Sequence, residues 1–302
     1  MERYLETSVP SFDGHRLWAR SIGWGKPALV LCDGLGCDGY VWKYLIPHFE
    51  RRHRIIHWNY RGHGKTAVPE NIETLCIEDF ARDLEQIIEH FQLKEPPLLL
   101  GHSMGVQVIL EFAHRFRSRA LGLVAITGSY GRALDHVHDA GWPKEVYPLL
   151  KSAFDRLEPL GRVFWKNFFT SELAYLYAVT FEINGRLIKR EDFFPYLEHL
   201  AHMDPRIFML TLEAAARHTA EPYLPEIDLP TLIIAAERDR FTPFWIGQRM
   251  QSLMPQARLV KLPMCSHTGP LEMPELTNLS IEKFLEELPR RAGRRRRSSA
   301  HE

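Results

Sequence analysis

The feature of this sequence that most constrains its fold is a repeated alternation of short apolar runs with helical patterns. The apolar runs are typical of strands buried on both faces of a sheet. The runs expected to be strands are 28–32, 54–60, 98–100, 121–127, 231–236 and 258–262. The helical patterns are 75–93, 104–117 and 271–288. Such alternation predicts an α/β fold, in which helices cover both faces of a mainly parallel sheet.

The size and charge of the chain narrow the class of protein further. With 302 residues, 45% of them hydrophobic, the chain can bury a large core without cross-links. Its 38 basic and 38 acidic residues balance to a net charge of zero, which argues against a surface built for nucleic acid. We expect one large domain with an inserted subdomain, and no specific nucleic-acid partner.

The cysteines and the hydropathy pattern suggest a cytoplasmic protein. The four cysteines are too few for a disulfide scaffold and lack the spacing of a zinc site. The sequence shows neither an apolar leader near its first residue nor a run of about 18 apolar residues that could cross a membrane. It also lacks a glycine-rich dinucleotide or phosphate motif. We therefore expect no metal and no cofactor.

The stretch 132–203 interrupts the alternation and is rich in aromatic residues, which make up 13 of its 72 positions against 11% of the whole chain. It predicts several short helices inserted as a cap. An apolar cavity is expected between such an insert and the sheet, with Trp142, Phe168 and Phe169 as candidate substrate-binding residues. The acidic residues of the insert are expected on solvated helix faces; they are Glu172, Glu182, Glu191 and Asp192.

The segment 289–302 is strongly basic, although the chain as a whole is neutral. It contains six arginines and one acidic residue, so the rest of the chain carries a formal charge of −5. Its composition predicts a disordered tail. We expect a solubilising or incidental extension. The alternative is weak contact with an anionic surface, lipid or nucleic acid, since each arginine near an anionic membrane contributes about 1 kcal/mol.

The sequence GHSMG at Gly101 to Gly105 follows a buried strand and opens a helix. This G-x-S-x-G pattern, in this context, is typical of a nucleophilic serine on a tight strand-to-helix turn. Small residues are needed on both sides of Ser103, because a Cβ atom there would collide with the packed strand or helix. The serine hydroxyl would lie beside the helix N-terminus, where backbone N–H groups favour negative charge.

A serine hydroxyl needs a base, and the base needs an orienting acid. His267 follows the strand 258–262 and is expected at the same sheet edge as Ser103, ahead of two weaker candidates, His63 and His102. Asp239 follows the strand 231–236 and is the favoured acid; the alternatives are Glu237 and Asp135. For the oxyanion hole, which requires two backbone donors, the positions predict the N–H groups of Met104 and Leu35.

With these residues in place, the chain resembles the α/β-hydrolase superfamily of serine esterases and lipases. The resemblance rests on GHSMG, NYRGHGKT, AERDRFTP and CSHTGPLEMPE, and covers roughly 10–130 and 204–288. It implies an eight-stranded, mainly parallel sheet, with a core formed by 1–131 and 204–288 and a helical cap at 132–203. It also implies Ser103 as nucleophile, Asp239 as acid and His267 as base. Relatives that open epoxides or displace halide carry aspartate at the position of Ser103, which argues against both activities.

Three positions depart from the pattern of the resembled family. Asp33 stands where histidine is usual, Asn59 where aspartate is common, and Val106 where glycine is common. A carboxylate directed into the oxyanion hole would oppose the charge formed there. We therefore expect the side chain of Asp33 to point away from Ser103 and to accept backbone N–H bonds within its loop.

The leading functional hypothesis is hydrolysis of carboxylic esters with an apolar acyl or alkyl portion, a small-molecule substrate. The same triad also serves thioesterases, carbon–carbon bond hydrolases, cofactor-free haloperoxidases and aminopeptidases. A further alternative, of a different class, is a ligand-binding receptor with little turnover. The sequence carries no signal for an oligomeric state.

Overall fold

The computed structural model describes residues 4–72, 75–136 and 158–288, together with five single positions between 145 and 156. Trp142 and the tail 289–302 lie outside the described residues, so the predictions for them stay predictions.

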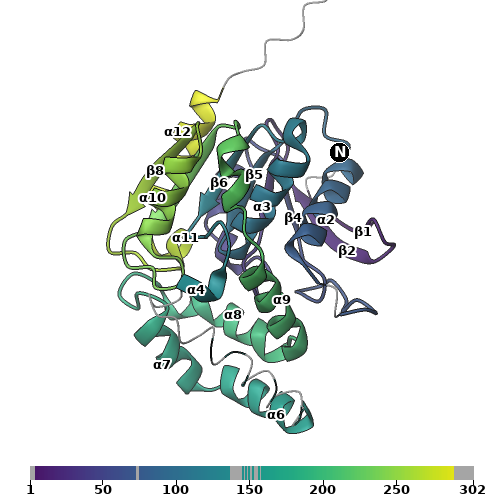
Figure 1. The fold of residues 1–302 in the computed structure, drawn as a ribbon, viewed down its shortest axis with the longest axis vertical. Helices are drawn as coiled ribbons and strands as arrows, with labels where there is room; N and C mark the ends of the chain where they lie inside the picture. The colour runs from purple at the N-terminus through teal and green to yellow at the C-terminus, as the bar shows by residue number, and fades with distance from the viewer. Residues whose placement is uncertain are drawn as a thin grey trace, which may run out of the picture.

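The sheet has eight strands in the order β1-β2-β4-β3-β5-β6-β7-β8 (Figure 1). The first two pairings, β1 with β2 and β2 with β4, are antiparallel, and all the others are parallel. This confirms the predicted fold class. The strand bounds are β1 Tyr4–Pro10, β2 Arg16–Ile22, β3 Leu29–Cys32, β4 Ile55–Trp58, β5 Leu98–His102, β6 Gly122–Ile126, β7 Thr231–Ala236 and β8 Ala257–Leu262.

The two N-terminal strands were not located from the sequence, for a physical reason. In β1 only Val9 is buried, and in β2 buried and partly exposed residues alternate. Antiparallel strands at a sheet edge need only one apolar face. They therefore lack the continuous apolar run that marks β3, β5 and β7, where every residue is buried.

Helices cover both faces of the sheet (Figure 1). One hydrophobic cluster joins one face to α2 (Ile77–His90), α3 (Met104–Arg115) and α10 (Phe244–Leu253). A second cluster joins the opposite face to α1 (Leu45–Phe49) and α12 (Pro274–Glu287). The short elements between them are η1 Tyr40–Trp42, η2 Arg117–Arg119, η4 Glu221–Glu226 and α11 Gly269–Glu272.

Four further helices, which we call the cap helices, gather at one end of the sheet (Figure 1). They are α6 Glu158–Phe169, α7 Glu172–Phe181, α8 Arg190–His202 and α9 Pro205–Arg217, preceded by the single turn α4 Ala133–His136. Helix α9 begins after the predicted insertion, yet its Ile207 packs in one cluster with Leu200 and Met203 of the α8 region. The chain beyond 203 therefore also contributes to the cap.

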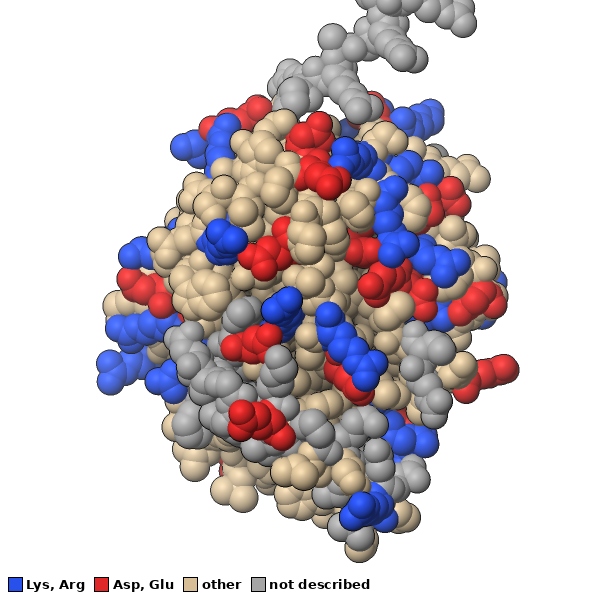
Figure 2. All heavy atoms as spheres, in the orientation of Figure 1, with Lys and Arg blue, Asp and Glu red and all other residues tan. Residues whose placement is uncertain are grey.

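The charged residues on the face drawn in Figure 2 are of both signs and interspersed. Ion pairs join strands and helices across the surface, as in Lys261 with Glu237 and Arg249 with Glu221. Among the described residues, none of the helices is long and apolar enough to cross a membrane.

Candidate active site

Ser103 occupies the tight turn between β5 and α3. Its backbone has φ 54° and ψ −119°, in the left-handed half of φ space that is strained for a non-glycine residue. A Cβ atom at Gly101 would lie 2.4 Å from the carbonyl oxygen of Gly105, and one at Gly105 would lie 2.2 Å from that of Cys32. The glycines thus allow strand and helix to approach closely enough to expose the serine between them.

The structure brings Ser103, His267 and Asp239 together in one hydrogen-bonded chain. His267 Nε2 lies 2.8 Å from Ser103 Oγ, and His267 Nδ1 lies 2.9 Å from Asp239 Oδ2. Asp239 Oδ1 accepts the backbone N–H groups of Phe241 and Thr242 at 2.8 and 2.9 Å, and Oδ2 accepts the Thr242 hydroxyl at 2.7 Å. Asp239 is therefore held as a fixed acceptor facing the imidazole.

Burial alone would lower the pKa of His267, because an apolar environment disfavours the imidazolium. The attraction and hydrogen bond of Asp239 outweigh burial, and the pKa of His267 is raised. An imidazole arranged in this way can take a proton from Ser103 and hold it while its positive charge is stabilised.

Two of the other candidates, His63 and Glu237, have different partners. Burial lowers the pKa of His63 to about 4, and its Nδ1 lies 3.1 Å from the carbonyl oxygen of Arg61. Glu237 instead accepts hydrogen bonds from Lys261 and from the backbone of Met264. The carboxylate that binds the imidazole of His267 is that of Asp239.

Glu272 and Thr127, which the sequence analysis did not assign, hold the loop of His267 together with His102. Glu272 accepts hydrogen bonds from the backbone N–H of Ser266 at 2.7 Å and from the Thr268 hydroxyl at 2.8 Å. The hydroxyl of Thr127 donates to the carbonyl oxygen of His267 at 2.9 Å, and His102 Nε2 lies 3.1 Å from the same oxygen. One sequence signal could have indicated the contacts of Glu272: a threonine stands directly before a short helix whose first turn contains this glutamate.

The side chain of Asp33 points away from Ser103, as predicted, but its partners were predicted wrongly. Its Oδ1 accepts the indole N–H of Trp42 at 2.6 Å, and its Oδ2 lies 2.8 Å from His57 Nε2. Two buried side chains, rather than backbone N–H groups, therefore satisfy this carboxylate. Both come from neighbouring elements, which sequence spacing did not reveal.

The other two departures also have structural partners. Val106 is buried on α3 and packs against Gly128. A Cβ atom added at Gly128 would lie 2.3 Å from Cγ2 of Val106. The side-chain Oδ1 of Asn59 accepts the backbone N–H of Lys65 at 3.0 Å, and the backbone carbonyl oxygen of Asn59 accepts the Thr66 hydroxyl at 2.9 Å. Neither substitution disturbs the position of Ser103.

The predicted oxyanion donors lie on the wall that carries Ser103. Leu35 and Met104 both line the cavity in front of it, and a Cβ atom at Gly34 would lie 3.1 Å from Ser103 Cβ. Within the described part of the chain, neither the N–H of Leu35 nor that of Met104 has a hydrogen-bond acceptor. Both are thus available to a ligand oxygen at this position.

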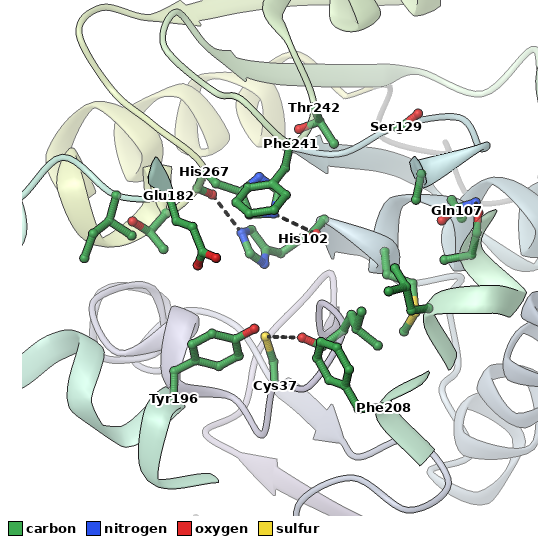
Figure 3. A pocket seen from close by; sticks show the side chains of 18 of the residues that line it. Cys37, His102, Gln107, Ser129, Glu182, Tyr196, Phe208, Phe241, Thr242 and His267 are labelled. Atoms are coloured by element: carbon green, nitrogen blue, oxygen red, sulfur yellow. Dashed lines mark hydrogen bonds between the residues drawn. The ribbon is translucent and has the colours of Figure 1, made fainter. Parts of the chain in front are cut away.

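A cavity of about 250 Å³ lies between the triad and the cap helices (Figure 3). Most of its wall is apolar. The aromatic residues that line it are Tyr40, Phe193, Tyr196, Phe208 and Phe241, and the polar ones include Cys37, Gln107, Ser129, Glu182 and Thr242. Among the described residues, we find no cluster of histidine, cysteine or acidic side chains that could hold a metal ion.

Two of the substrate-binding residues predicted in the cap do not line the cavity as expected. Phe168 and Phe169 do not belong to the described lining of this cavity; they pack against each other, with ring centres 5.1 Å apart, inside the cap. Aromatic richness marked the cap but not which rings face the sheet. The expectation of solvated acidic side chains was wrong for Glu182, which lines the cavity, and for Asp192, which is buried against Lys43 and Tyr44.

Comparison with known proteins places this geometry in context. Residues 27–274 match the family model described as the alpha/beta hydrolase fold. The chain is 26% identical over 268 residues to the polyketide synthase ThaQ of Burkholderia thailandensis, covering 88% of this chain but only 12% of that protein. It is 22% identical over 264 residues to the 3-oxoadipate enol-lactonase 2 of Acinetobacter baylyi, covering 86% and 89%.

Among solved structures, the chain is similar to a thermophilic esterase from Thermogutta terrifontis. The two superpose with a TM-score of 0.75 at 20% sequence identity, covering 94% of this chain and 99% of the esterase. At this level of sequence identity, the similarity shows a shared fold.

Proposed function

Because the chain belongs to the α/β-hydrolase fold family, we propose that it is a serine hydrolase that cleaves small carboxylic esters. One observation carries the proposal: the unbroken chain of hydrogen bonds from Asp239 through His267 to Ser103, which ends at the wall of an apolar cavity. A nucleophile, its base and an orienting acid are the groups that acyl transfer requires.

In the first half of the reaction, Ser103 Oγ attacks the ester carbonyl while His267 Nε2 takes its proton. Asp239 keeps the proton on Nδ1 and stabilises the imidazolium. The carbonyl oxygen becomes negative and is bound by the N–H groups of Leu35 and Met104 at the start of α3. When the intermediate collapses, His267 returns the proton to the leaving alcohol, and an acyl group remains on Ser103.

In the second half, water takes the place of the alcohol. His267 removes a proton from the water, which attacks the acyl carbon. The same two N–H groups stabilise the second oxyanion. When this intermediate collapses, His267 returns the proton to Ser103 Oγ, and the acid product leaves. Asp33 does not oppose either charge, because its carboxylate is bound by Trp42 and His57.

The size of the cavity supports a small substrate. At about 250 Å³ it lies below the range of roughly 300–1,000 Å³ that is usual for drug-sized ligands. Its apolar wall favours a short hydrocarbon portion. The similarity to an esterase and an enol-lactonase supports cleavage of a carbon–oxygen acyl bond.

A fluorophosphonate probe and p-nitrophenyl esters of increasing acyl length test this function. We expect covalent labelling of the purified protein, and ester hydrolysis that declines as the acyl chain outgrows the cavity. Both activities should disappear in Ser103→Ala and persist in Ser252→Ala, a serine on α10 whose hydroxyl donates to the carbonyl of Arg249. Absence of labelling, under conditions in which a known esterase reacts, would contradict the proposal.

A further inference from the structure

The cavity contains one carboxylate that the proposed reaction does not use. Glu182 follows α7, and its side chain projects into the cavity in Figure 3. Among the described residues, we find no hydrogen-bond donor or cation that pairs with this carboxylate. Burial raises the pKa of Glu182 to about 7, with a smaller opposing contribution from His267. Glu182 is half-buried, and a carboxylate that is partly withdrawn from water without a partner opposes folding unless a ligand satisfies it.

The position of Glu182 is fixed relative to the triad. Two residues further on, the backbone N–H of Asn184 donates to Ser266 Oγ at 3.0 Å and to Glu272 Oε1 at 3.1 Å. The side-chain amide of Asn184 donates to the carbonyl oxygen of Met264 at 2.9 Å. These contacts fasten the end of α7 to the loop that carries His267. The backbone close to Glu182 is therefore fixed relative to the loop of the base.

Aromatic rings surround the same part of the cavity. Tyr40 and Tyr196 stack with ring centres 4.9 Å apart, and Phe193 meets Tyr40 edge-on at 6.3 Å. The charge of Glu182 acts on both tyrosines, contributing to their raised pKa values after the larger effect of burial. Aromatic faces attract cations, and a carboxylate beside them adds a full opposite charge.

We propose that Glu182, together with Tyr40, Tyr196 and Phe193, forms a subsite that binds a cationic group of the ester substrate, either a protonated amine or a quaternary ammonium group. This inference rests on the proposed ester hydrolysis and deepens it. The cation neutralises the carboxylate, while its alkyl substituents fill the apolar wall. The same carboxylate disfavours esters that carry a negative charge at this end.

A purely structural or positioning role for Glu182 predicts something different. A structural carboxylate needs a donor within the protein, and the described residues provide none. A carboxylate that acted only through His267 would change the hydrolysis of all esters by the same factor. A cation subsite instead changes the ratio between cationic and neutral esters, and that ratio is the quantity to measure.

Two matched pairs of esters measure this ratio. In the first, the O-acetyl ester of choline is compared with the acetate ester in which a tert-butyl group replaces the trimethylammonium group. In the second, the same two groups end the acyl chain of a p-nitrophenyl ester, because the subsite can lie on either side of the scissile bond. We expect the wild-type protein to favour the cationic ester in at least one pair. Glu182→Gln should reduce that preference about tenfold, as expected for a hydrogen bond or contact between opposite charges.

Glu172→Gln is the matched control, since Glu172 begins the same helix but is exposed and paired with Arg190. This control should keep the wild-type ratio. Equal ratios in wild type and Glu182→Gln for both pairs would overturn the subsite, even with efficient hydrolysis of every ester. If the wild-type protein hydrolyses none of the four, the proposed function fails, and binding decides the subsite separately. Phenyltrimethylammonium ion, followed by calorimetry, should bind wild type about tenfold more tightly than Glu182→Gln; equal affinities would refute the subsite.

Discussion

The carboxyl edge of the sheet and the cap helices contribute to the same cavity in different ways. At the sheet edge, Ser103 and Asp239 follow strands in which every residue is buried, and the position of Ser103 depends on close backbone contacts. The outer surface of the cap, by contrast, exposes large apolar side chains. Leu160, Phe164, Leu173 and Leu176 are between 59% and 72% exposed.

This difference shows how the two regions divide their tasks. Reacting groups need positions fixed within a fraction of an ångström, which a buried sheet supplies. Substrate selection needs a wall of suitable shape and charge, which loosely packed helices can supply with few constraints on their own sequence. The predictions below test whether chemistry and stability depend on the sheet edge more steeply than on the cap.

The largest effect is expected at the sheet edge for Asp239→Asn. The amide oxygen would keep the bonds from Phe241 and Thr242, leaving the amide nitrogen to face His267 Nδ1. The imidazole would then carry its proton on Nε2, directed at Ser103, and could not act as base. We expect kcat to fall by about 10⁴-fold with little change in KM.

Steady-state kinetics with a p-nitrophenyl ester measure this effect. The matched control is Glu237→Gln, two residues earlier, whose carboxylate lies among Lys261 and Met264 at the surface. A loss in the control as large as that in Asp239→Asn would contradict the assignment of the acid.

The second prediction compares one glycine from each region. A Cβ atom at Gly105 would lie 2.2 Å from Cys32 O and 2.7 Å from Asp33 O, both backbone atoms that cannot yield. At Gly185, after α7, the nearest atom is 3.2 Å away, in the movable side chain of Val179. Chemical denaturation should show that Gly105→Ala lowers the free energy of unfolding by about 3 kcal/mol.

For Gly185→Ala we expect the free energy of unfolding to change by no more than about 1 kcal/mol. The neighbouring side chain of Val179 can move, and alanine reduces the conformational freedom of the unfolded chain. Similar losses in the two variants would indicate that the cap is packed as tightly as the sheet edge.

The third prediction concerns the attachment of the cap. Asp192 on α8 is buried and accepts hydrogen bonds from Lys43 and from the hydroxyl of Tyr44. Removing the carboxylate in Asp192→Ala should weaken this attachment by about 2 kcal/mol. Hydrogen exchange should accelerate in α8 while the amides of β5 keep their protection. In Glu191→Gln, the exposed neighbour, exchange should be unchanged; acceleration throughout the sheet in Asp192→Ala would show that the two regions unfold together.

The smallest effect is a pH dependence of stability arising from Glu182, whose pKa is raised from 4.5 to about 7 by burial. A carboxyl group with a raised pKa binds its proton more tightly when folded. Its contribution to stability is therefore present at low pH and lost as the pH rises through 7. The titratable groups that interact with it are His267, Tyr40, Tyr177 and Tyr196.

Glu182→Gln lacks this titration, so between pH 6 and pH 8 it should gain about 1 kcal/mol of stability relative to wild type. Thermal unfolding at several pH values measures the difference. A constant difference across this range, as we expect for Glu172→Gln, would mean that Glu182 is solvated.

The fold and the triad could be predicted because both depend on local patterns. Apolar runs located six of the strands, and parallel strands bring their carboxyl ends to one edge, where Ser103, Asp239 and His267 each follow a strand. The strands β1 and β2 escaped because their burial alternates.

The remainder of the site depends on contacts between distant segments. The partners of Asp33 come from another strand and a neighbouring turn. Glu182 ends an apparently ordinary helix, and only its packing against the His267 loop directs it inward. Sequence spacing contains no record of such contacts, because they form between segments that only the folded chain brings together.

The hydrogen bonds of Asn184 to the loop of His267 also bear on how such a protein can change through recombination. An inserted subdomain is easily regarded as an exchangeable module. Here one end of it is bonded to Ser266, Glu272 and Met264. The bonds to Ser266 and Glu272 come from a backbone N–H, which any residue but proline supplies, whereas the bond to Met264 requires the side chain of Asn184. A chimera that exchanges the cap therefore keeps the most contacts with the loop of the base when it retains Asn184.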